Sequence, residues 1–176
     1  MSPGRKPLRF GVFPLGIAGT PDGLATGPPD DPDRIAEALE QLRGGGRPWL
    51  VRMYVVWTGP DSTPRCLEEL GRLAAHHWDL DIVLSYKDPT GDVDAWLGLV
   101  TEAVTNWGHR LSTLQITGEA NLTGGGDGDF PRVGEALVRG VIDAAVVKAD
   151  RGTTVEIATD VLQVAYVEVY RETGSG

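Results

Sequence analysis

Short apolar runs alternate with stretches of helical periodicity along most of the chain. Runs rich in apolar and β-branched residues predict buried strands at 8–15, 49–57, 81–86, 114–117 and 153–158. Between them, apolar residues recur at the spacing of one helical face in stretches that begin near Pro32, before Leu67, near Asp92 and near Phe130. Residues 16–31, dense in Gly, Pro and Asp, are predicted to form a loop.

Repeated strand–helix units predict an α/β fold, because right-handed crossovers leave the strands parallel and covered by helices. A doubly wound sheet and a barrel both satisfy this pattern. The barrel is favoured because the units have a regular length of roughly 35 to 45 residues and no Gly-x-Gly-x-x-Gly follows the first strand. We therefore expect a partial TIM (β/α) barrel, about five parallel strands with four helices over residues 8–160, in a single domain of residues 1–176.

The last residues, 161–176, break this rhythm. Their VLQVAYVEVY segment has no helical spacing and is typical of extended structure. A complete barrel takes about 250 residues and has no free strand edge, so a sheet of this size would leave two edges exposed. Three outcomes stay open: the chain is a fragment, it forms a homo-oligomer through its exposed barrel edges, or the tail covers part of the opening.

Composition and charge exclude several classes of protein. The net charge of −9 argues against nucleic acid as a partner, because phosphate binding needs clustered Lys and Arg. No apolar run approaches the ~20 residues that a membrane helix needs. Residues 1–9 lack the apolar stretch of a signal peptide, so a cytoplasmic location is expected by default.

No cofactor or metal site is predicted. Cys66 is the only cysteine, which excludes a disulfide within one chain and makes a Cys-based metal site improbable. The loop 123–129 (TGGGDGD) lacks the Lys-Ser/Thr of a phosphate loop and the later Glu of a calcium hand. It is interpreted as a flexible lid over the mouth of the barrel.

The most informative residue is Glu119, which follows the fourth predicted strand. Barrels of this class place their active sites at the carboxyl ends of the strands, so a carboxylate at this position predicts chemistry. Asn121 lies beside it in the sequence and is suited either to a sugar hydroxyl or to stabilising its own turn. Glu119 is therefore the candidate catalytic residue and Asn121 a candidate ligand contact.

Other polar or aromatic residues follow the remaining strands. Trp57 could stack on the apolar face of a sugar ring, or be a core residue at the end of its strand. Tyr86 and Lys87 could line the same mouth, although Lys87-Asp88-Pro89 also has the composition of an ordinary turn. Asp160, after the fifth strand, is a further candidate contact.

The pattern Gly118-Glu119-Ala120-Asn121 at the end of the fourth strand resembles the glycoside hydrolases with (β/α)8 barrels, in particular the large clan A, which places its acid/base Glu there. The resemblance covers residues 8–160, as the amino-terminal portion of such a barrel. It implies that Glu119 is a general acid/base. Those enzymes commonly carry Asn directly before this Glu, whereas this chain has Gly118.

The resemblance implies a carbohydrate or related small molecule as the ligand. Glycoside hydrolysis needs two carboxylates across the scissile bond, and the clan takes its nucleophile from a seventh strand that this sequence lacks. Hydrolysis by this chain alone is therefore not expected. A noncatalytic carbohydrate-binding or scaffold domain is the alternative; an aldolase or isomerase is a further one, although no Schiff-base lysine pattern supports it.

Overall fold

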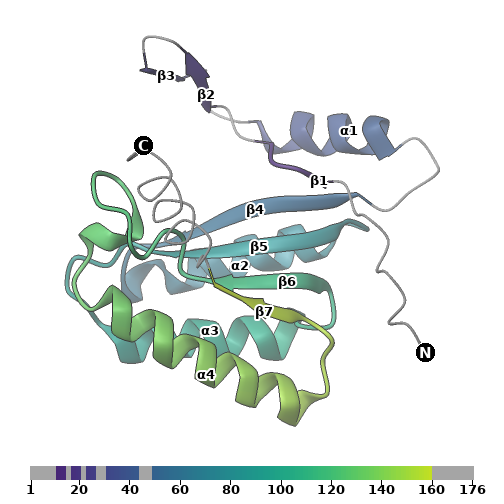
Figure 1. Cartoon of the computed structure of the whole chain (residues 1–176). Coiled ribbons are helices and arrows are strands. Elements are labelled where there is room, and N and C mark those ends of the chain that lie inside the picture. The colour runs from purple at the N-terminus through teal and green to yellow at the C-terminus, as the bar shows by residue number, and fades with distance from the viewer. Residues whose placement is uncertain (1–10, 15–16, 21–22, 27–30, 44–48, 160–176) are drawn as a thin grey trace, which may run out of the picture.

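The computed structural model describes residues 11–14, 17–20, 23–26, 31–43 and 49–159. It is an α/β fold built on a five-stranded sheet in which every neighbouring pair of strands is parallel (Figure 1). The strands lie side by side in chain order: β1 (Gly11–Val12), β4 (Leu50–Trp57), β5 (Asp79–Tyr86), β6 (Leu111–Ile116) and β7 (Glu156–Ala158).

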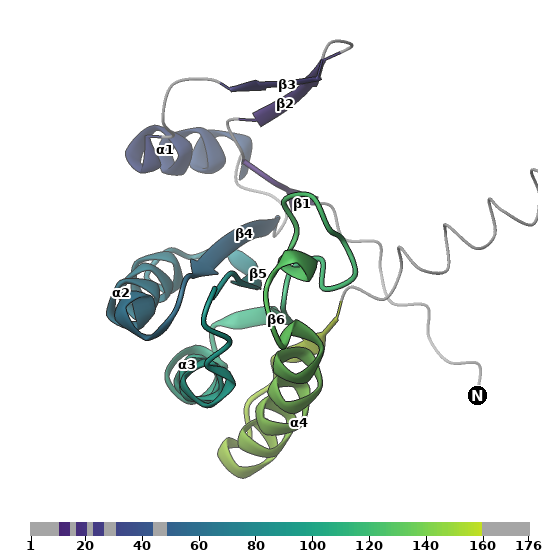
Figure 2. The same cartoon turned by 90° about the vertical axis from the view of Figure 1, so that its left-hand side faces the viewer.

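Helices connect these strands. They are α1 (Pro32–Arg43), α2 (Thr63–Ala74), α3 (Val93–Trp107) and α4 (Val133–Arg151). Short 3₁₀ turns, η1 (Pro60–Ser62) and η2 (Asp127–Asp129), precede α2 and α4. The helices α2, α3 and α4 cover one face of the sheet, while α1 lies beside its β1 edge (Figure 2). We call the face covered by α2, α3 and α4 the helix face. The opposite face, on which none of these three helices lies, is called the free face, although Asp81, Val83 and Ser85 of β5 are buried there.

Aspartate side chains begin two of the helices. Asp31 Oδ1 accepts hydrogen bonds from the amides of Asp33 (3.0 Å) and Arg34 (3.2 Å) at the start of α1. Asp92 accepts from the amide of Ala95 (3.0 Å) at the start of α3. Each carboxylate satisfies amides that have no partner within the helix, which explains why the helices begin at these residues.

The core lies between the sheet and α2, α3 and α4. At its centre the rings of Trp57, Tyr86 and Trp96 pack with centroids 5.3–5.5 Å apart. Gly140 brings α4 close to β6, because a Cβ at this position would lie 2.7 Å from Ile116 Cγ2 and 3.2 Å from Trp96 Nε1. From α3, the apolar stripe predicted from the sequence places Val93, Trp96, Val100 and Val104 in this core, all 0% exposed.

The structure confirms the α/β class and the parallel direction of the strands. Strand bounds shift by several residues: β5 and β6 begin earlier than predicted, at Asp79 and Leu111, and β7 begins later, at Glu156. The early part of β6 was missed because Ser112 and Thr113 interrupt its apolar run. The predicted tail, 161–176, and Asp160 lie outside the described residues.

The prediction of a loop at 16–31 was wrong. This segment contains two strands, β2 (Ile17–Thr20) and β3 (Gly23–Thr26), which pair antiparallel in a separate two-stranded sheet. Glycine and threonine in these strands carry little of the apolar alternation by which a strand is recognised. This hairpin is defined by the pairing of β2 with β3, and the composition of the segment does not reveal that pairing.

No helix in the described part of the chain is long and apolar enough to cross a membrane.

Candidate functional site

Glu119 lies just beyond the carboxyl end of β6, at the edge of the sheet where β4 and β5 also end. We call residues 87–88 after β5 and 117–129 after β6 the carboxyl rim. Glu119 is half-buried and Asn121 is exposed. The Glu119 carbonyl accepts hydrogen bonds from the amides of Leu122 (3.0 Å) and Gly128 (3.2 Å), which close a turn over the end of the strand. The structure therefore brings Glu119 and Asn121 to the position that the sequence predicted.

Asp127 anchors the carboxyl rim to the sheet. Its carboxylate is almost fully buried, with 2% of the residue exposed. It accepts hydrogen bonds from Ser85 Oγ (2.6 Å), the Tyr86 amide (2.7 Å) and the Gly118 amide (2.6 Å). Bonds to an ionised acceptor are among the stronger ones in proteins. Gly118 permits this approach, since a Cβ there would lie 3.2 Å from Asp127 Oδ1.

A second set of bonds holds the glycine-rich part of the rim. Lys87 Nζ donates to the carbonyl of Gly125 (2.8 Å), and Asp129 accepts from the amides of Gly124 (2.9 and 3.0 Å) and Gly125 (2.6 Å). The amides of Gly125 and Gly124 lower the pKa of Asp129. Together with Asp127 these contacts tie the loop at several points, so the interpretation of it as a flexible lid is not supported.

Thr117 has a strained backbone directly before Gly118 and Glu119. Its φ of 64° lies in the left-handed region, which β-branched residues rarely adopt. Its Oγ1 is buried and has no hydrogen-bond partner within the described part of the chain. Such outliers occur where surrounding contacts impose them and are frequent at functional sites. Here the Asp127 bond to the Gly118 amide is one such contact, and the strain turns the chain sharply into Glu119.

Trp57 and Tyr86 point into the core and not toward the carboxyl rim. Both are 0% exposed. Trp57 Nε1 donates to Thr63 Oγ1 (2.9 Å), and the Tyr86 hydroxyl donates to the carbonyl of Pro131 (3.2 Å). Burial, and secondarily the charge of Asp88, raises the pKa of Tyr86. Because neither ring presents a face to solvent, the packing of Trp57 supports the core role, which was one of its two predicted alternatives, and Tyr86 does not line the mouth.

Of the two rim residues after β5, Lys87 contacts the glycine-rich loop, whereas Asp88 is buried in the turn that follows. Asp88 accepts hydrogen bonds from the amides of Thr90 (2.9 Å) and Asp92 (2.7 Å) and from the Thr90 hydroxyl (2.8 and 2.9 Å). Burial alone would raise the pKa of Asp88, but these hydrogen bonds outweigh it and lower the pKa. The prediction from composition that Lys87-Asp88-Pro89 forms an ordinary turn is therefore confirmed for Asp88, whose carboxylate stabilises that turn.

The free face of the sheet carries a polar cluster that sequence reasoning missed. Arg52 on β4 donates to Asp81 Oδ2 on β5 (2.7 Å) and to Gln115 Oε1 on β6 (2.6 Å). Gln115 Nε2 donates in turn to the carbonyls of Thr117 and Gly118, both at 3.1 Å. The cluster therefore connects the middle of the free face to the carboxyl rim beside Glu119.

The signal for this cluster was present in the sequence. Arg52, Asp81 and Gln115 interrupt apolar runs that a sheet covered on both faces would leave continuous. In the register of the sheet Arg52 lies opposite Asp81, and Asp81 lies opposite Thr113. A charged residue inside an otherwise apolar strand indicates that a polar partner lies on the next strand. It does not identify which residue that partner is.

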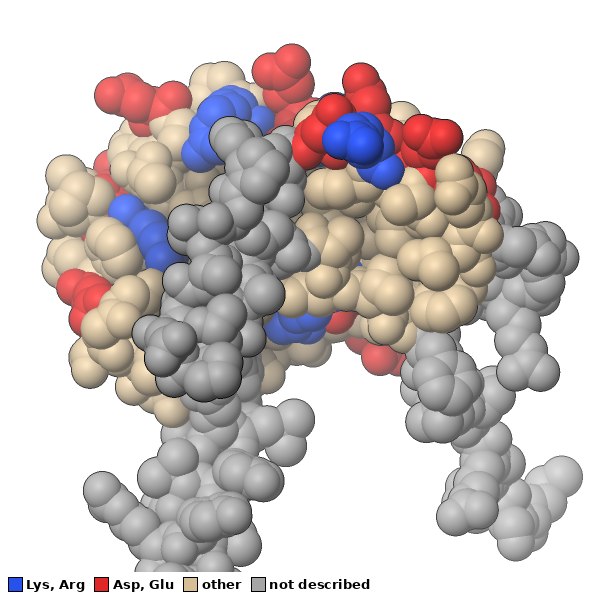
Figure 3. Space-filling view, turned by 90° about the horizontal axis from the view of Figure 1, so that it is seen from above, with Lys and Arg blue, Asp and Glu red and all other residues tan. Residues whose placement is uncertain are grey.

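The remaining predictions concern ligands and charge. Asp160 lies outside the described residues. Within the described ranges, no group of three or more His, Cys, Asp or Glu side chains could hold a metal ion. On the face seen in Figure 3, basic side chains stand in separate small groups among acidic ones and form no continuous stripe.

Comparison with known proteins found no matching family model, no matching curated protein and no matching solved structure.

Proposed function

We propose that the chain is a glycoside hydrolase-like domain that binds carbohydrate at its carboxyl rim, with Glu119 as the central polar contact. The observation that carries the proposal is the position of Glu119, directly after the fourth of five parallel strands that lie in chain order. In (β/α) barrels the corresponding edge holds the active site. Glu119 and Asn121 offer hydrogen-bonding groups there, and both are at least partly accessible.

The barrel-like architecture belongs to the same proposal. Strands in chain order, with α2, α3 and α4 all on one face, are what the first units of a (β/α) barrel would have. Arg52, Asp81, Thr113 and Glu156 are successive register partners across β4, β5, β6 and β7, and they lie on the face that a barrel would turn inward.

Binding is favoured over hydrolysis because the other carboxylates at the rim are already hydrogen-bonded to backbone amides. Glycoside hydrolysis requires a second carboxylate across the bond from the proton donor. Asp88, Asp127 and Asp129 each accept hydrogen bonds from backbone amides, which keep them in structural roles. A noncatalytic carbohydrate-binding domain is therefore the form of the proposal that the geometry supports best, and acid/base chemistry by Glu119 is the alternative.

Titration calorimetry of the full chain against a panel of neutral oligosaccharides tests the proposal. We expect binding to at least one of them, and a loss of about tenfold or more in affinity in Glu119→Gln, because a charged acceptor gives stronger hydrogen bonds than an amide. Glu102→Gln is the matched control, since Glu102 is exposed on α3. Absence of binding to the whole panel would remove the proposal.

Turnover of aryl glycosides, measured in parallel, separates the two forms. We expect none from the unaltered chain. Hydrolysis that disappears in Glu119→Gln and persists in Glu102→Gln would instead assign Glu119 as an acid/base and replace the binding role by catalysis.

A further inference from the structure

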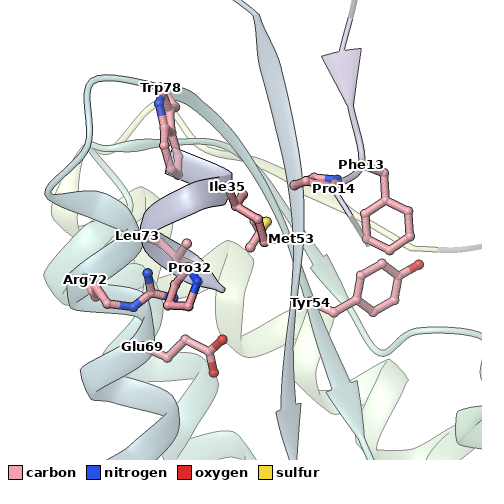
Figure 4. A pocket seen from close by; sticks show the side chains of 10 residues that line it. All are labelled: Phe13, Pro14, Pro32, Ile35, Met53, Tyr54, Glu69, Arg72, Leu73 and Trp78. Carbon is pink, nitrogen blue, oxygen red and sulfur yellow. The ribbon is translucent and has the colours of Figure 1, made fainter. Parts of the chain in front are cut away.

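A cavity of about 280 Å³ lies between α1, α2 and β4, away from the carboxyl rim (Figure 4). None of the residues that line it belongs to the rim or to the Arg52 cluster. Its volume is just below the range of about 300–1,000 Å³ that is typical of ligand pockets, so a ligand here would be small.

The cavity lies beyond the point where β1 pairs with β4. Among the described residues, β1 pairs with β4 at Gly11 with Leu50 and at Val12 with Val51. The chain continues through Phe13 to Pro14, which has no amide hydrogen to donate. Met53 and Tyr54, further along β4, therefore line the cavity.

Aromatic and apolar side chains form most of the wall. The Phe13 and Tyr54 rings pack against each other with centroids 5.1 Å apart on one side of β4. Trp78 closes another side, and its Nε1 donates to Glu40 Oε1 on α1 (3.1 Å). Ile35, Met53 and Leu73 also line the cavity. Such a wall favours a ligand with an apolar or aromatic body.

Two charged side chains from α2, Glu69 and Arg72, also line the cavity. Arg72 is exposed, so its guanidinium keeps its hydration. Glu69 is partly buried, and its carboxylate has no hydrogen bond or ion pair within the described part of the chain. Burial raises the pKa of Glu69, although Arg65 and Arg72 oppose the effect. A carboxylate that has lost hydration without gaining a donor is the group that a ligand can compensate.

We propose that this cavity binds a small aromatic or aliphatic amine, whose ammonium group pairs with Glu69 while its apolar body fills the space lined by Ile35, Met53 and Leu73. The ammonium supplies the N–H donors that Glu69 lacks, and its charge adds to the attraction that Arg65 and Arg72 already exert. This inference is independent of carbohydrate binding at the carboxyl rim.

Three probes of one shape test it: phenethylamine, 2-phenylethanol and 3-phenylpropionate, titrated into the full chain with calorimetric detection. We expect the amine to bind about tenfold or more tightly than the alcohol, since an ion pair replaces a neutral contact, and the acid to bind most weakly. Tighter binding of the acid would show that Arg72 recognises the ligand and would overturn the proposal. Equal binding of amine and alcohol, or no binding of any probe, would also overturn it.

Variants locate the site. Glu69→Gln is expected to reduce the affinity for phenethylamine to that for 2-phenylethanol, whereas Glu68→Gln, the neighbouring exposed carboxylate, leaves both affinities unchanged. Ile35→Trp, which fills the cavity from α1, is expected to abolish binding of both probes. Full amine affinity in Glu69→Gln, with an unchanged melting temperature as evidence of folding, would contradict the assignment.

The pH dependence gives a further readout. Protonation of Glu69 removes the charge that pairs with the ammonium, so the affinity for the amine falls as pH is lowered through the raised pKa of Glu69. The affinity for 2-phenylethanol stays constant over the same range. An amine affinity that does not change with pH in this range would count against Glu69.

Discussion

The two faces of the main sheet differ in kind. The helix face of β5 carries Leu80, Ile82 and Leu84, all 0% exposed against α2 and α3. The free face of the same strand carries Asp81, Val83 and Ser85. One strand therefore presents a wholly apolar surface on one side and an alternation of polar and apolar residues on the other.

This difference shows how each face is stabilised. On the helix face, removal of apolar surface from water contributes about 25 cal/mol per Å². On the free face, Arg52 donates to Asp81 Oδ2 and to Gln115 Oε1, while Asp81 Oδ1 has no hydrogen-bond partner among the described residues. Loss of Arg52 would leave both acceptors without this donor. The helix face should therefore respond to changes of volume, and the free face to the loss of single partners.

The largest effect is expected from Trp96→Ala on the helix face. Trp96 is 0% exposed, packs on the rings of Trp57 and Tyr86, and donates from Nε1 to the carbonyl of Ala136 (3.1 Å). Removing the ring should lower the free energy of unfolding by about 3–5 kcal/mol. Urea denaturation followed by circular dichroism measures it. Trp107→Ala, a partly exposed position on the same helix, should cost less than half as much; equal losses would refute the contrast.

A smaller effect is expected on the free face. Arg52→Met leaves Asp81 without its cation and should lower the free energy of unfolding by about 2 kcal/mol, a value reduced because the Arg52 side chain is 32% exposed. Combining it with Asp81→Leu should restore most of this loss, because both charges are then gone. A double-mutant cycle in urea measures the coupling. Strictly additive losses would mean that the pair is not coupled.

Two glycines of α4 allow the effect of one added methyl group to be compared at a tightly packed and at an open position. Gly140→Ala should lower the free energy of unfolding by about 1–2 kcal/mol, because its Cβ would meet Ile116 Cγ2 at 2.7 Å and force α4 from β6. Gly134→Ala meets nothing within 4 Å and should raise it by about 0.5–1 kcal/mol. Thermal melting of both variants gives the signs, and the same sign in both would contradict the close packing.

The smallest effect concerns acid sensitivity where β5 ends. The pKa of Asp88 is lowered in the folded chain, because its hydrogen bonds from Thr90 and Asp92 outweigh the effect of burial. A lowered pKa means that the contribution to stability is present above the unfolded pKa of about 4 and is lost as pH falls through the folded pKa. Asp88→Asn should therefore cost about 1 kcal/mol at pH 7 and flatten the loss of stability below pH ~4. Melting temperatures across this range test it; an unchanged slope would exclude Asp88 as the group responsible.

Much of the fold could be predicted because its signals are local. The apolar stripe of α3 and the apolar runs of β4 and β5 depend only on spacing within one element. The hairpin of β2 and β3 was not predicted, since its strands are recognised by pairing and not by alternation. The candidate site was predicted in part: Glu119, Asn121 and Lys87 lie at the carboxyl rim, whereas Trp57 and Tyr86 lie in the core.

The amino-acid sequence by itself determined the order of the elements and, through the parallel direction of the strands, the edge at which Glu119 lies. Only the tertiary structure decided which polar groups meet. Asp127 finds Ser85 and Tyr86 more than forty residues away in the chain, and Asp81 meets Arg52 through a register that no local pattern encodes. Periodicity acts over a few residues, whereas the pairing of buried polar groups depends on how separate strands align.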